Sequence, residues 1–356
     1  MNKQIQNHLM HRKSFYSYLL FSSISSLLLL LLFGCATTSQ SVPTTKTVGT
    51  YIWPAPPATA RFKWITQWSN RYDFGKPSEV LEFLIGKERI ETLRRPNGVV
   101  ADSDGSVYVA ESEMHIVFVF DNTKKTLRFL GMGRLSAPIG LAVNNKAGII
   151  YVSDSQQHKI FCIDKNTDNV VMSIGGPSEF KRPTGLAFDE EREKLYVADT
   201  QNHVVKVFAK DGSLLSTIGK RGNNDGEFNF PSYLALDRNG RLYVVDSFNF
   251  RIQIFDSDGK FIKKFGKLGD SSGYFSRPAG IGVDSEGHIY VVDSAFNNFQ
   301  VFNEEGKLLL WVGNTGNKPG EFYLPSGMYI DRGDKIYVSD TFNRRVQVFQ
   351  YLKDQK

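Results

Sequence analysis

Cysteine is almost absent from this sequence. Only Cys35 and Cys162 occur among its 356 residues, and no Cys-x-x-Cys pair exists. Two cysteines so placed exclude a disulfide framework, a zinc ribbon and a c-type haem attachment site. Cys162 lies in the apolar segment 160–163, which is typical of a buried and inert thiol.

A strong excess of charge is also missing. The formal net charge is +6 at pH 7, but Lys3, Arg12 and Lys13 lie within the first 34 residues, which contain no acid. The remaining chain carries 40 basic and 37 acidic residues, a net charge of +3. That balance does not indicate a nucleic-acid-binding surface, because dedicated binders are usually much more basic.

The signatures of common enzyme classes are absent as well. The sequence contains no Gly-x-Ser-x-Gly elbow, no His-Glu-x-x-His pair, no phosphate-binding loop and no set of kinase motifs. The spacing of residues therefore gives no reason to expect catalysis, and we expect no cofactor.

One long apolar run is present, close to the N-terminus. Residues 19–33 contain six consecutive leucines, follow the three basic residues and are interrupted by four serines. This run is short for a membrane span and typical of a signal peptide. It ends in Leu32-Phe33-Gly34-Cys35, which resembles the bacterial lipobox, although Phe33 is less usual at its position; the alternative is an ordinary signal peptide with a chance cysteine.

The lipobox resemblance implies that residues 1–34 are removed and that Cys35 is lipidated. Because Ala36 rather than Asp follows this cysteine, the resemblance further implies an exported protein held by a lipid anchor in the outer membrane of the cell envelope. We expect residues 35–59 to form a flexible tether, since they are rich in Ser and Thr and then in Pro.

Six copies of one pattern fill the rest of the chain. Each copy runs from a proline through an apolar stretch and a turn to a Tyr-Val pair or its equivalent, which an acid closes. The prolines are Pro96, Pro138, Pro183, Pro231, Pro278 and Pro325. The acids are Glu111, Asp154, Asp199, Asp246, Asp293 and Asp340, spaced 43 to 47 residues apart. This period predicts a repeat architecture.

Each copy is expected to form four antiparallel strands. In the fifth copy they are predicted at 280–283, 288–292, 299–302 and 307–312 from alternating patterns and turn residues. The sixth copy lacks a fourth strand, and 61–68 is a spare strand pattern before the first copy. We therefore predict an all-β six-bladed β-propeller over 60–352, closed by an N-terminal strand that completes the last blade.

Several copies resemble the NHL repeat. The resemblance rests on Asp199-Thr200-Gln201-Asn202-His203 and on the related runs that begin at Asp246 and Asp340. It implies a six-bladed propeller but no particular activity, because NHL propellers include amidating lyases, binding modules and bacterial surface lipoproteins. The metal centre and the Tyr/Arg set of the lyases cannot be matched to positions in this sequence.

Three histidines invite a metal interpretation. His115, His158 and His203 each lie four residues after the acid of their copy. Zinc requires imidazoles that converge, whereas these occupy equivalent turns of separate blades. We therefore predict local packing and no metal site. The six acids are likewise expected to accept backbone N–H bonds in the turns that follow them.

Departures from the repeat point to a binding face. Tyr233 stands where the other copies have glycine, and aromatic side chains accumulate in the turns between the second and third strands of copies four to six. The candidate partner-binding residues are Tyr233, Phe248, Phe250, Phe296, Phe342 and Arg344. Arg182 and Arg277 are expected to add a basic edge. The alternative is that the rings fill gaps between blades.

These observations favour an envelope-anchored scaffold that binds a protein, peptide or glycan, and not nucleic acid. The alternative is a metal-dependent lyase or hydrolase with its site in the central channel, which would place converging His or carboxylate groups there. A binding protein would instead have the residues after each proline in the channel wall: Asn97, Ile139, Thr184, Ser232, Ala279 and Ser326. A short helix at 78–85 is expected to cover the channel mouth or to lengthen a loop.

Overall fold

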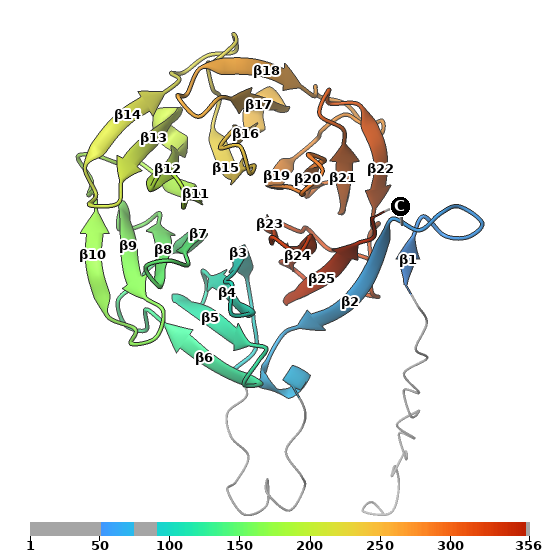
Figure 1. Ribbon diagram of the computed structural model, residues 1–356, viewed down its shortest axis with the longest axis horizontal. Coiled ribbons are helices and arrows are strands. Elements are labelled where there is room, and N and C mark those ends of the chain that lie inside the picture. Colours follow the sequence, from blue (N-terminus) through green and yellow to red (C-terminus); the bar gives the residue numbers. More distant parts are fainter. Residues whose placement is uncertain (1–50, 75–90, 354–356) are drawn as a thin grey trace, which may run out of the picture. The chain divides into compact units, whose positions relative to one another are not determined.

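The computed structural model describes residues 51–74 and 91–353 (Figure 1). The predicted signal peptide, Cys35, the tether up to residue 50 and the predicted helix at 78–85 lie outside the described residues. None of the helices in the described part is long and apolar enough to cross a membrane.

Six small sheets form a closed ring around a central channel, as the repeat predicted (Figure 1). In each sheet the first strand is innermost and its neighbours follow outward in antiparallel order. Blade one comprises β3 (Pro96–Ala101), β4 (Ser106–Glu111), β5 (Ile116–Asp121) and β6 (Thr126–Leu130). Blade two comprises β7 (Pro138–Asn144), β8 (Ile149–Asp154), β9 (Lys159–Asp164) and β10 (Val170–Ile174).

The next three blades repeat this order. Blade three comprises β11 (Pro183–Asp189), β12 (Lys194–Asp199), β13 (Val204–Ala209) and β14 (Leu214–Ile218). Blade four comprises β15 (Pro231–Leu236), β16 (Leu242–Asp246), β17 (Arg251–Phe255) and β18 (Phe261–Phe265). Blade five comprises β19 (Pro278–Val283), β20 (Ile289–Asp293), β21 (Asn298–Phe302) and β22 (Leu308–Val312).

Blade six is built from both ends of the described chain. It comprises β23 (Met328–Ile330), β24 (Lys335–Asp340) and β25 (Arg345–Tyr351), followed by β2 (Phe62–Trp68) as its fourth strand. β2 pairs antiparallel with β25, from Phe62 opposite Tyr351 to Trp68 opposite Val346. The predicted closure is confirmed. A fifth strand, β1 (Ile52–Trp53), pairs outside β2 within the stretch predicted as tether.

The cores lie between adjacent blades. One apolar cluster, for example, joins Tyr290 and Phe299 of blade five to Ile336 and Phe349 of blade six, with Phe62 of β2 among them. A sheet this small cannot bury both faces alone, so each blade is stable only against its neighbours. Three single-turn 3-10 helices, η1 (Arg71–Phe74), η2 (Thr200–Asn202) and η3 (Ser247–Asn249), complete the described elements.

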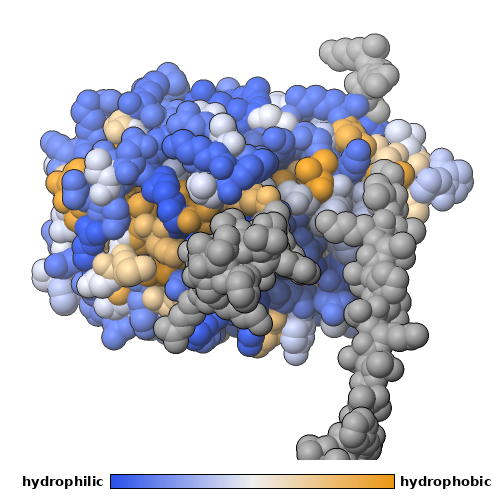
Figure 2. All heavy atoms as spheres, turned by 90° about the horizontal axis from the view of Figure 1, so that it is seen from below, coloured by the Kyte–Doolittle hydropathy of each residue, from blue (hydrophilic) through white to orange (hydrophobic). Residues whose placement is uncertain are grey.

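The outermost strands form the wall of the ring. Their side chains alternate between the interblade cores and solvent, and apolar residues such as Val171, Leu214 and Trp311 are exposed there. Figure 2 views the ring from below Figure 1 and shows apolar areas within a mostly hydrophilic surface. Such scattered apolar residues are common on soluble domains and do not by themselves indicate a site.

Candidate functional site

The turns between second and third strands and the loops before the six prolines emerge on the same side of the ring, which we call the loop face. Buried acids join these segments. Glu111 accepts backbone N–H bonds from Arg94 and Arg95 at 2.7 and 2.8 Å, and from Glu113 in its own turn at 3.0 Å. The five equivalent aspartates also accept from the loop before the proline of their blade. The acids thus shape the loop face.

Hydroxyl groups that directly follow these acids connect neighbouring blades. Thr200 donates to the carbonyl oxygen of Pro231 at 2.8 Å, which links blade three to blade four. Thr341 donates to the carbonyl oxygen of Pro96 at 2.9 Å, which links blade six back to blade one. Because both hydroxyls are buried, these bonds fix the blades against one another beneath the loop face.

Glycines two residues after the prolines let the innermost strands approach one another. A Cβ atom on Gly140 would lie 2.0 Å from the carbonyl oxygen of Thr184, and one on Gly98 would lie 2.5 Å from that of Ile139. At these two positions no residue larger than glycine fits without backbone movement. We call this ring of close approaches the neck of the channel.

Tyr233 occupies the neck position of blade four. Its half-buried ring packs against the core between blades four and five and against that between blades five and six. The hydroxyl interacts with the side chain of Ser326 in blade six, and burial raises the pKa of Tyr233 to about 12. The phenol therefore lies toward the channel, as expected from the sequence, and remains neutral at physiological pH.

Two of the predicted aromatic residues stand out from the loop face. Phe248 and Phe342 are 62% and 52% exposed. Each pairs with an aromatic residue from the adjacent loop: Phe230 lies 4.9 Å from Phe248, and Tyr323 lies 5.5 Å from Phe342, between ring centroids. Sequence reasoning missed Phe230 and Tyr323. Their positions, one and two residues before a repeat proline, were the available signal.

The other three candidates are placed differently. Phe250 has a left-handed backbone with φ of 53° and packs against the core between blades four and five. Phe296 is half-buried. Arg344 is exposed, and its carbonyl oxygen accepts a bond from Ser69 Oγ at 2.9 Å. Exposed aromatic area on the loop face therefore comes chiefly from Phe248, Phe342 and Tyr323, the last of which is 47% exposed.

The residues immediately before the six prolines alternate in character around the channel. In blade order they are Arg95, Ala137, Arg182, Phe230, Arg277 and Leu324. The three arginines are exposed, and none of them forms an ion pair with any residue of 51–74 or 91–353. Arginine is favoured in binding surfaces because its guanidinium matches carboxylates in a two-pronged geometry. Sequence reasoning identified Arg182 and Arg277 but not Arg95.

Two of the three histidines make local contacts, whereas Nδ1 of His158 is buried without a hydrogen-bond partner among the described residues. His203 Nδ1 accepts the backbone N–H of Phe230 at 3.2 Å, and its ring lies 4.5 Å from the Phe230 ring. Burial and then Arg221 lower the pKa of His203. His115 bonds to the carbonyl oxygen of Ser136. Across the described ranges, no three His, Cys, Asp or Glu side chains gather so as to hold a metal ion.

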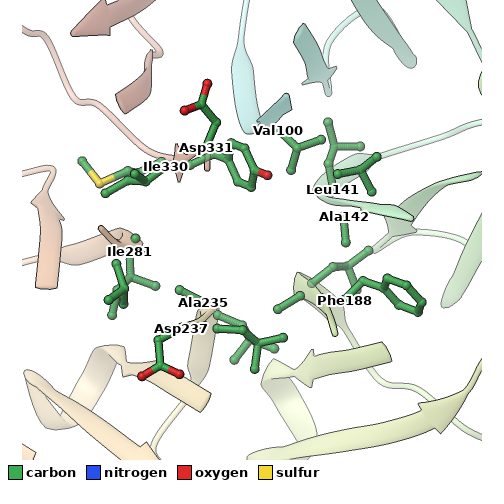
Figure 3. A pocket seen from close by; sticks show the side chains of 18 of the residues that line it. Val100, Leu141, Ala142, Phe188, Ala235, Asp237, Ile281, Ile330 and Asp331 are labelled. Atoms are coloured by element: carbon green, nitrogen blue, oxygen red, sulfur yellow. The ribbon is translucent and has the colours of Figure 1, made fainter. Parts of the chain in front are cut away.

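Below the neck the channel widens into a cavity of about 640 Å³ (Figure 3). Its wall begins with the neck glycines and continues through aliphatic side chains of the innermost strands to the turns that follow them. None of the six post-proline residues predicted for this wall lines the cavity. Their four polar side chains bond to hydroxyls above it instead, as Thr184 does to Thr200 at 2.7 Å and Ser232 to Ser247 at 2.6 Å. The wall thus starts one residue later than predicted.

Carboxylates surround the far mouth of the cavity, on the face opposite the loop face, but they point away from its centre. Figure 3 shows Asp237 and Asp331 directed outward while Ala235 and Ile281 line the space. Asp331 accepts the Tyr337 hydroxyl at 3.1 Å and two backbone N–H groups of its own turn. These acids stabilise turns and do not form a convergent reactive set.

Comparison with known families agrees with this architecture. A family model described as a 6-bladed beta-propeller matches residues 234–297 and 283–354. The NHL repeat model matches residues 93–120. No curated protein sequence matches the chain significantly.

Solved structures with the same fold are distant in sequence. A structural genomics protein of unknown function from Bacteroides thetaiotaomicron is 18% identical with a TM-score of 0.58, over 72% of this chain and 70% of that one. An auxiliary nutrient binding protein from the same organism is 13% identical with a TM-score of 0.58, over 73% and 72%. Virginiamycin B lyase from Staphylococcus aureus is 13% identical with a TM-score of 0.55, over 82% and 100%. At these identities the likeness concerns the fold.

Proposed function

Because this chain is a six-bladed β-propeller with NHL-type repeats, we propose that it acts as a rigid binding scaffold of the cell envelope. Its partner binds the loop face. One observation carries this proposal: three exposed arginines without ion pairs to described residues surround the channel and lie among exposed aromatic rings.

The side chains of the loop face indicate which chemical class of partner would bind there. Arg95, Arg182 and Arg277 offer three guanidinium groups, whereas the buried acids beneath them are occupied by backbone bonds. Phe248 and Phe342 add apolar contact area beside the arginines. An acidic segment of a protein or peptide, or a carboxylated glycan, would satisfy both features. The nutrient-binding description of one structural neighbour is compatible with a binding role.

Anchoring is the second part of the proposal. We infer that residues 1–34 direct export and that Cys35 is lipidated and held in the outer membrane. Incorporation of radiolabelled palmitate into the full-length protein in its bacterial host would test this. The label is expected in the wild type and lost in Cys35→Ala. Palmitate incorporation into Cys35→Ala equal to that of the wild type would contradict lipidation at this cysteine.

Partner binding is tested by crosslinking in intact envelopes and capture of the full-length protein. A double variant, Phe248→Ala with Phe342→Ala, is expected to reduce a specifically crosslinked partner at least several-fold. The matched control replaces Leu214 and Leu215 on the outer wall, which are 55% and 51% exposed. It should capture as the wild type does. Unchanged capture by the loop-face variant would refute the proposed face.

A charge variant tests the contribution of the arginines to partner binding separately from that of the aromatic rings. Glutamine at Arg95, Arg182 and Arg277 should weaken capture and make the remaining capture less sensitive to salt, because fewer charge contacts remain to be screened. If salt sensitivity is unchanged, the partner is not recognised through these arginines.

A further inference from the structure

The cavity below the neck exists because one position in the repeat carries small residues. The fourth residue after each proline is Val100, Ala142, Ala187, Ala235 or Gly282 in blades one to five and Tyr329 in blade six. All six line the same cavity of about 640 Å³. Sites for small molecules usually measure about 300 to 1,000 Å³ and are mostly apolar with a few polar groups.

Tyr329 is the only one of these six residues with a polar side chain. Its ring packs beside Tyr337, with 6.3 Å between ring centroids, and against the cores on both sides of blade one. Burial, and then the nearby carboxylate of Asp331, raise the pKa of Tyr329, so the phenol is a neutral donor at physiological pH. Its hydroxyl has no hydrogen-bond partner among the residues that the structure describes. Tyr329 is only partly buried and lines the cavity, so an acceptor group of a molecule in the cavity can take this donor.

The far mouth of the cavity is crossed by an ion pair. Arg332 in blade six lies 3.0 Å from Glu190 in blade three, measured from Nη2 to Oε2. Arg238 of blade four donates to the carbonyl oxygen of Arg332 at 3.1 Å. Blades three and six are opposite each other in a ring of six, so the ion pair spans the mouth (Figure 1). Glu190 also accepts the backbone N–H of Asn145.

Among the described residues, Arg238 is the one cation at this mouth without a carboxylate partner, and it is exposed to solvent. The aspartates of the rim bond to their own turns, and Glu190 bonds to Arg332 and Asn145. A ligand ion in the apolar part would lose its hydration without gaining a counter-ion there. The walls instead offer aliphatic surface, and each buried CH₂ group of a ligand contributes about 0.8 kcal/mol.

We propose that the cavity is a binding site for a small, uncharged and largely apolar molecule that carries one hydrogen-bond acceptor. The apolar body lies among the small residues of the innermost strands, and Tyr329 donates to the acceptor. The Arg332–Glu190 pair closes the mouth behind it. This site is separate from the loop face and does not depend on the function proposed there.

Benzophenone is a suitable probe, since it is uncharged, apolar and carries one carbonyl acceptor. On irradiation it also attaches to nearby C–H groups. Full-length protein is irradiated with increasing benzophenone, and the modified peptides are identified by mass spectrometry. Adducts are expected in β7, β11, β15 and β19, and labelling should saturate. Adducts that are confined to the outer wall, or that do not saturate, would overturn the proposal.

Filling the cavity provides the first variant. Ala187→Leu together with Ala235→Leu should reduce labelling of the innermost strands at least tenfold, because the added side chains occupy the space. Ala295→Leu, at an exposed position on the loop face, is the matched control and should label as the wild type does. Undiminished labelling in a folded filled variant would contradict a cavity site.

Tyr329→Phe keeps the shape of the site and removes the donor. It is expected to raise the benzophenone concentration for half-maximal labelling about three- to tenfold, the effect of one hydrogen bond. Competition by diphenylmethane, which has no carbonyl oxygen, should be unchanged. Equal half-maximal concentrations in the two proteins would show that Tyr329 does not bind the acceptor. Phe248→Ala with Phe342→Ala should leave labelling intact, so failure of one proposal is distinguishable from failure of the other.

Discussion

Arg345 and Asp340 form a buried ion pair, with Arg345 Nε 2.7 Å from Asp340 Oδ2. The same guanidinium donates through Nη1 to the side chain of Gln67 in β2 at 2.7 Å. It also donates to the backbone carbonyl of Glu321 in the loop before blade six at 2.9 Å. One side chain therefore joins the acid beneath the loop face to the N-terminal strand that closes the ring.

Replacement of Arg345 by Met should destabilise the protein strongly. The variant leaves the Asp340 carboxylate buried without its cation, and losing one partner of a buried pair usually costs about 3–5 kcal/mol. The free energy of unfolding measured with denaturant should fall by this amount. A loss below about 1 kcal/mol would show that the pair contributes little.

Arg251→Met is the control that shows whether the effect of Arg345→Met comes from ring closure or only from the loss of a buried ion pair. Arg251 forms the equivalent pair with Asp246 in blade four, at 2.8 Å, but its Nη1 donates to the carbonyl oxygen of Asn223 and not to a residue of β2. Both variants should lose stability, whereas only Arg345→Met should speed hydrogen exchange in residues 62–68. Equal exchange in both variants would refute a specific role of Arg345 in holding β2.

Phe62 should be a major contributor to closure. Its side chain is 1% exposed, and its ring lies 5.8 Å from Tyr290 and 6.0 Å from Phe299. Phe62→Ala is expected to cost about 3–5 kcal/mol, because it opens a cavity between blades five and six. Ile65→Ala on the same strand is the control, since Ile65 is 43% exposed and should change stability by no more than about 0.5 kcal/mol. Chemical denaturation measures both.

Adding a single methyl group at the neck should destabilise the fold. Gly140→Ala would place a Cβ 2.0 Å from the backbone of blade three, so it is expected to destabilise by about 1–3 kcal/mol through overpacking. A Cβ on Gly176 would meet nothing within 4 Å, and Gly176→Ala is the control. If thermal unfolding shows the same midpoint for both variants, the neck is less rigid than the contacts imply.

Stability should depend on pH through His288. A hydrogen bond with Asp284 at 2.8 Å raises the pKa of His288, while burial opposes this rise; Glu286 adds to it and Arg61 opposes it. A pKa raised in the folded state means that the stabilisation is complete below the ordinary value, about 6.5. It is lost as pH rises through the raised pKa.

The measurement compares thermal unfolding of the wild type and His288→Gln from about pH 5 to about pH 9. The difference in midpoint between the two proteins should be largest at the acidic end and shrink above neutrality. A constant difference across this range would mean that the charge on His288 does not stabilise the fold.

The number of blades and the closing strand could be predicted because short sequence patterns indicate them. Each proline, turn and closing acid recurs at a regular interval, and the missing fourth strand of the last copy has one candidate replacement at 61–68. The role of the six acids as acceptors of backbone N–H bonds was also predictable, since an aspartate before a turn commonly bonds to the backbone of that turn. Glu111 performs the same role as the aspartates, although it differs from them in sequence.

The cavity and the detail of the loop face could not be predicted in the same way. The cavity wall combines one position from six strands that are more than 40 residues apart, so its shape follows from how the blades approach at the neck. Phe250 and Phe248 have similar sequence surroundings, yet the left-handed backbone at Phe250 turns its ring inward. β1 was missed because two residues carry no periodic signal.

Blade six has a consequence for the order of events during synthesis. Its outer strand β2 is made early, whereas β25, its hydrogen-bonding partner, ends at Tyr351. Until that last segment emerges, β2 has no sheet to join and blades one to five form an arc with two exposed ends. A break in the chain before β25 should therefore leave both ends of the arc open to proteolysis, because the ring is closed only by a strand made after the first five blades.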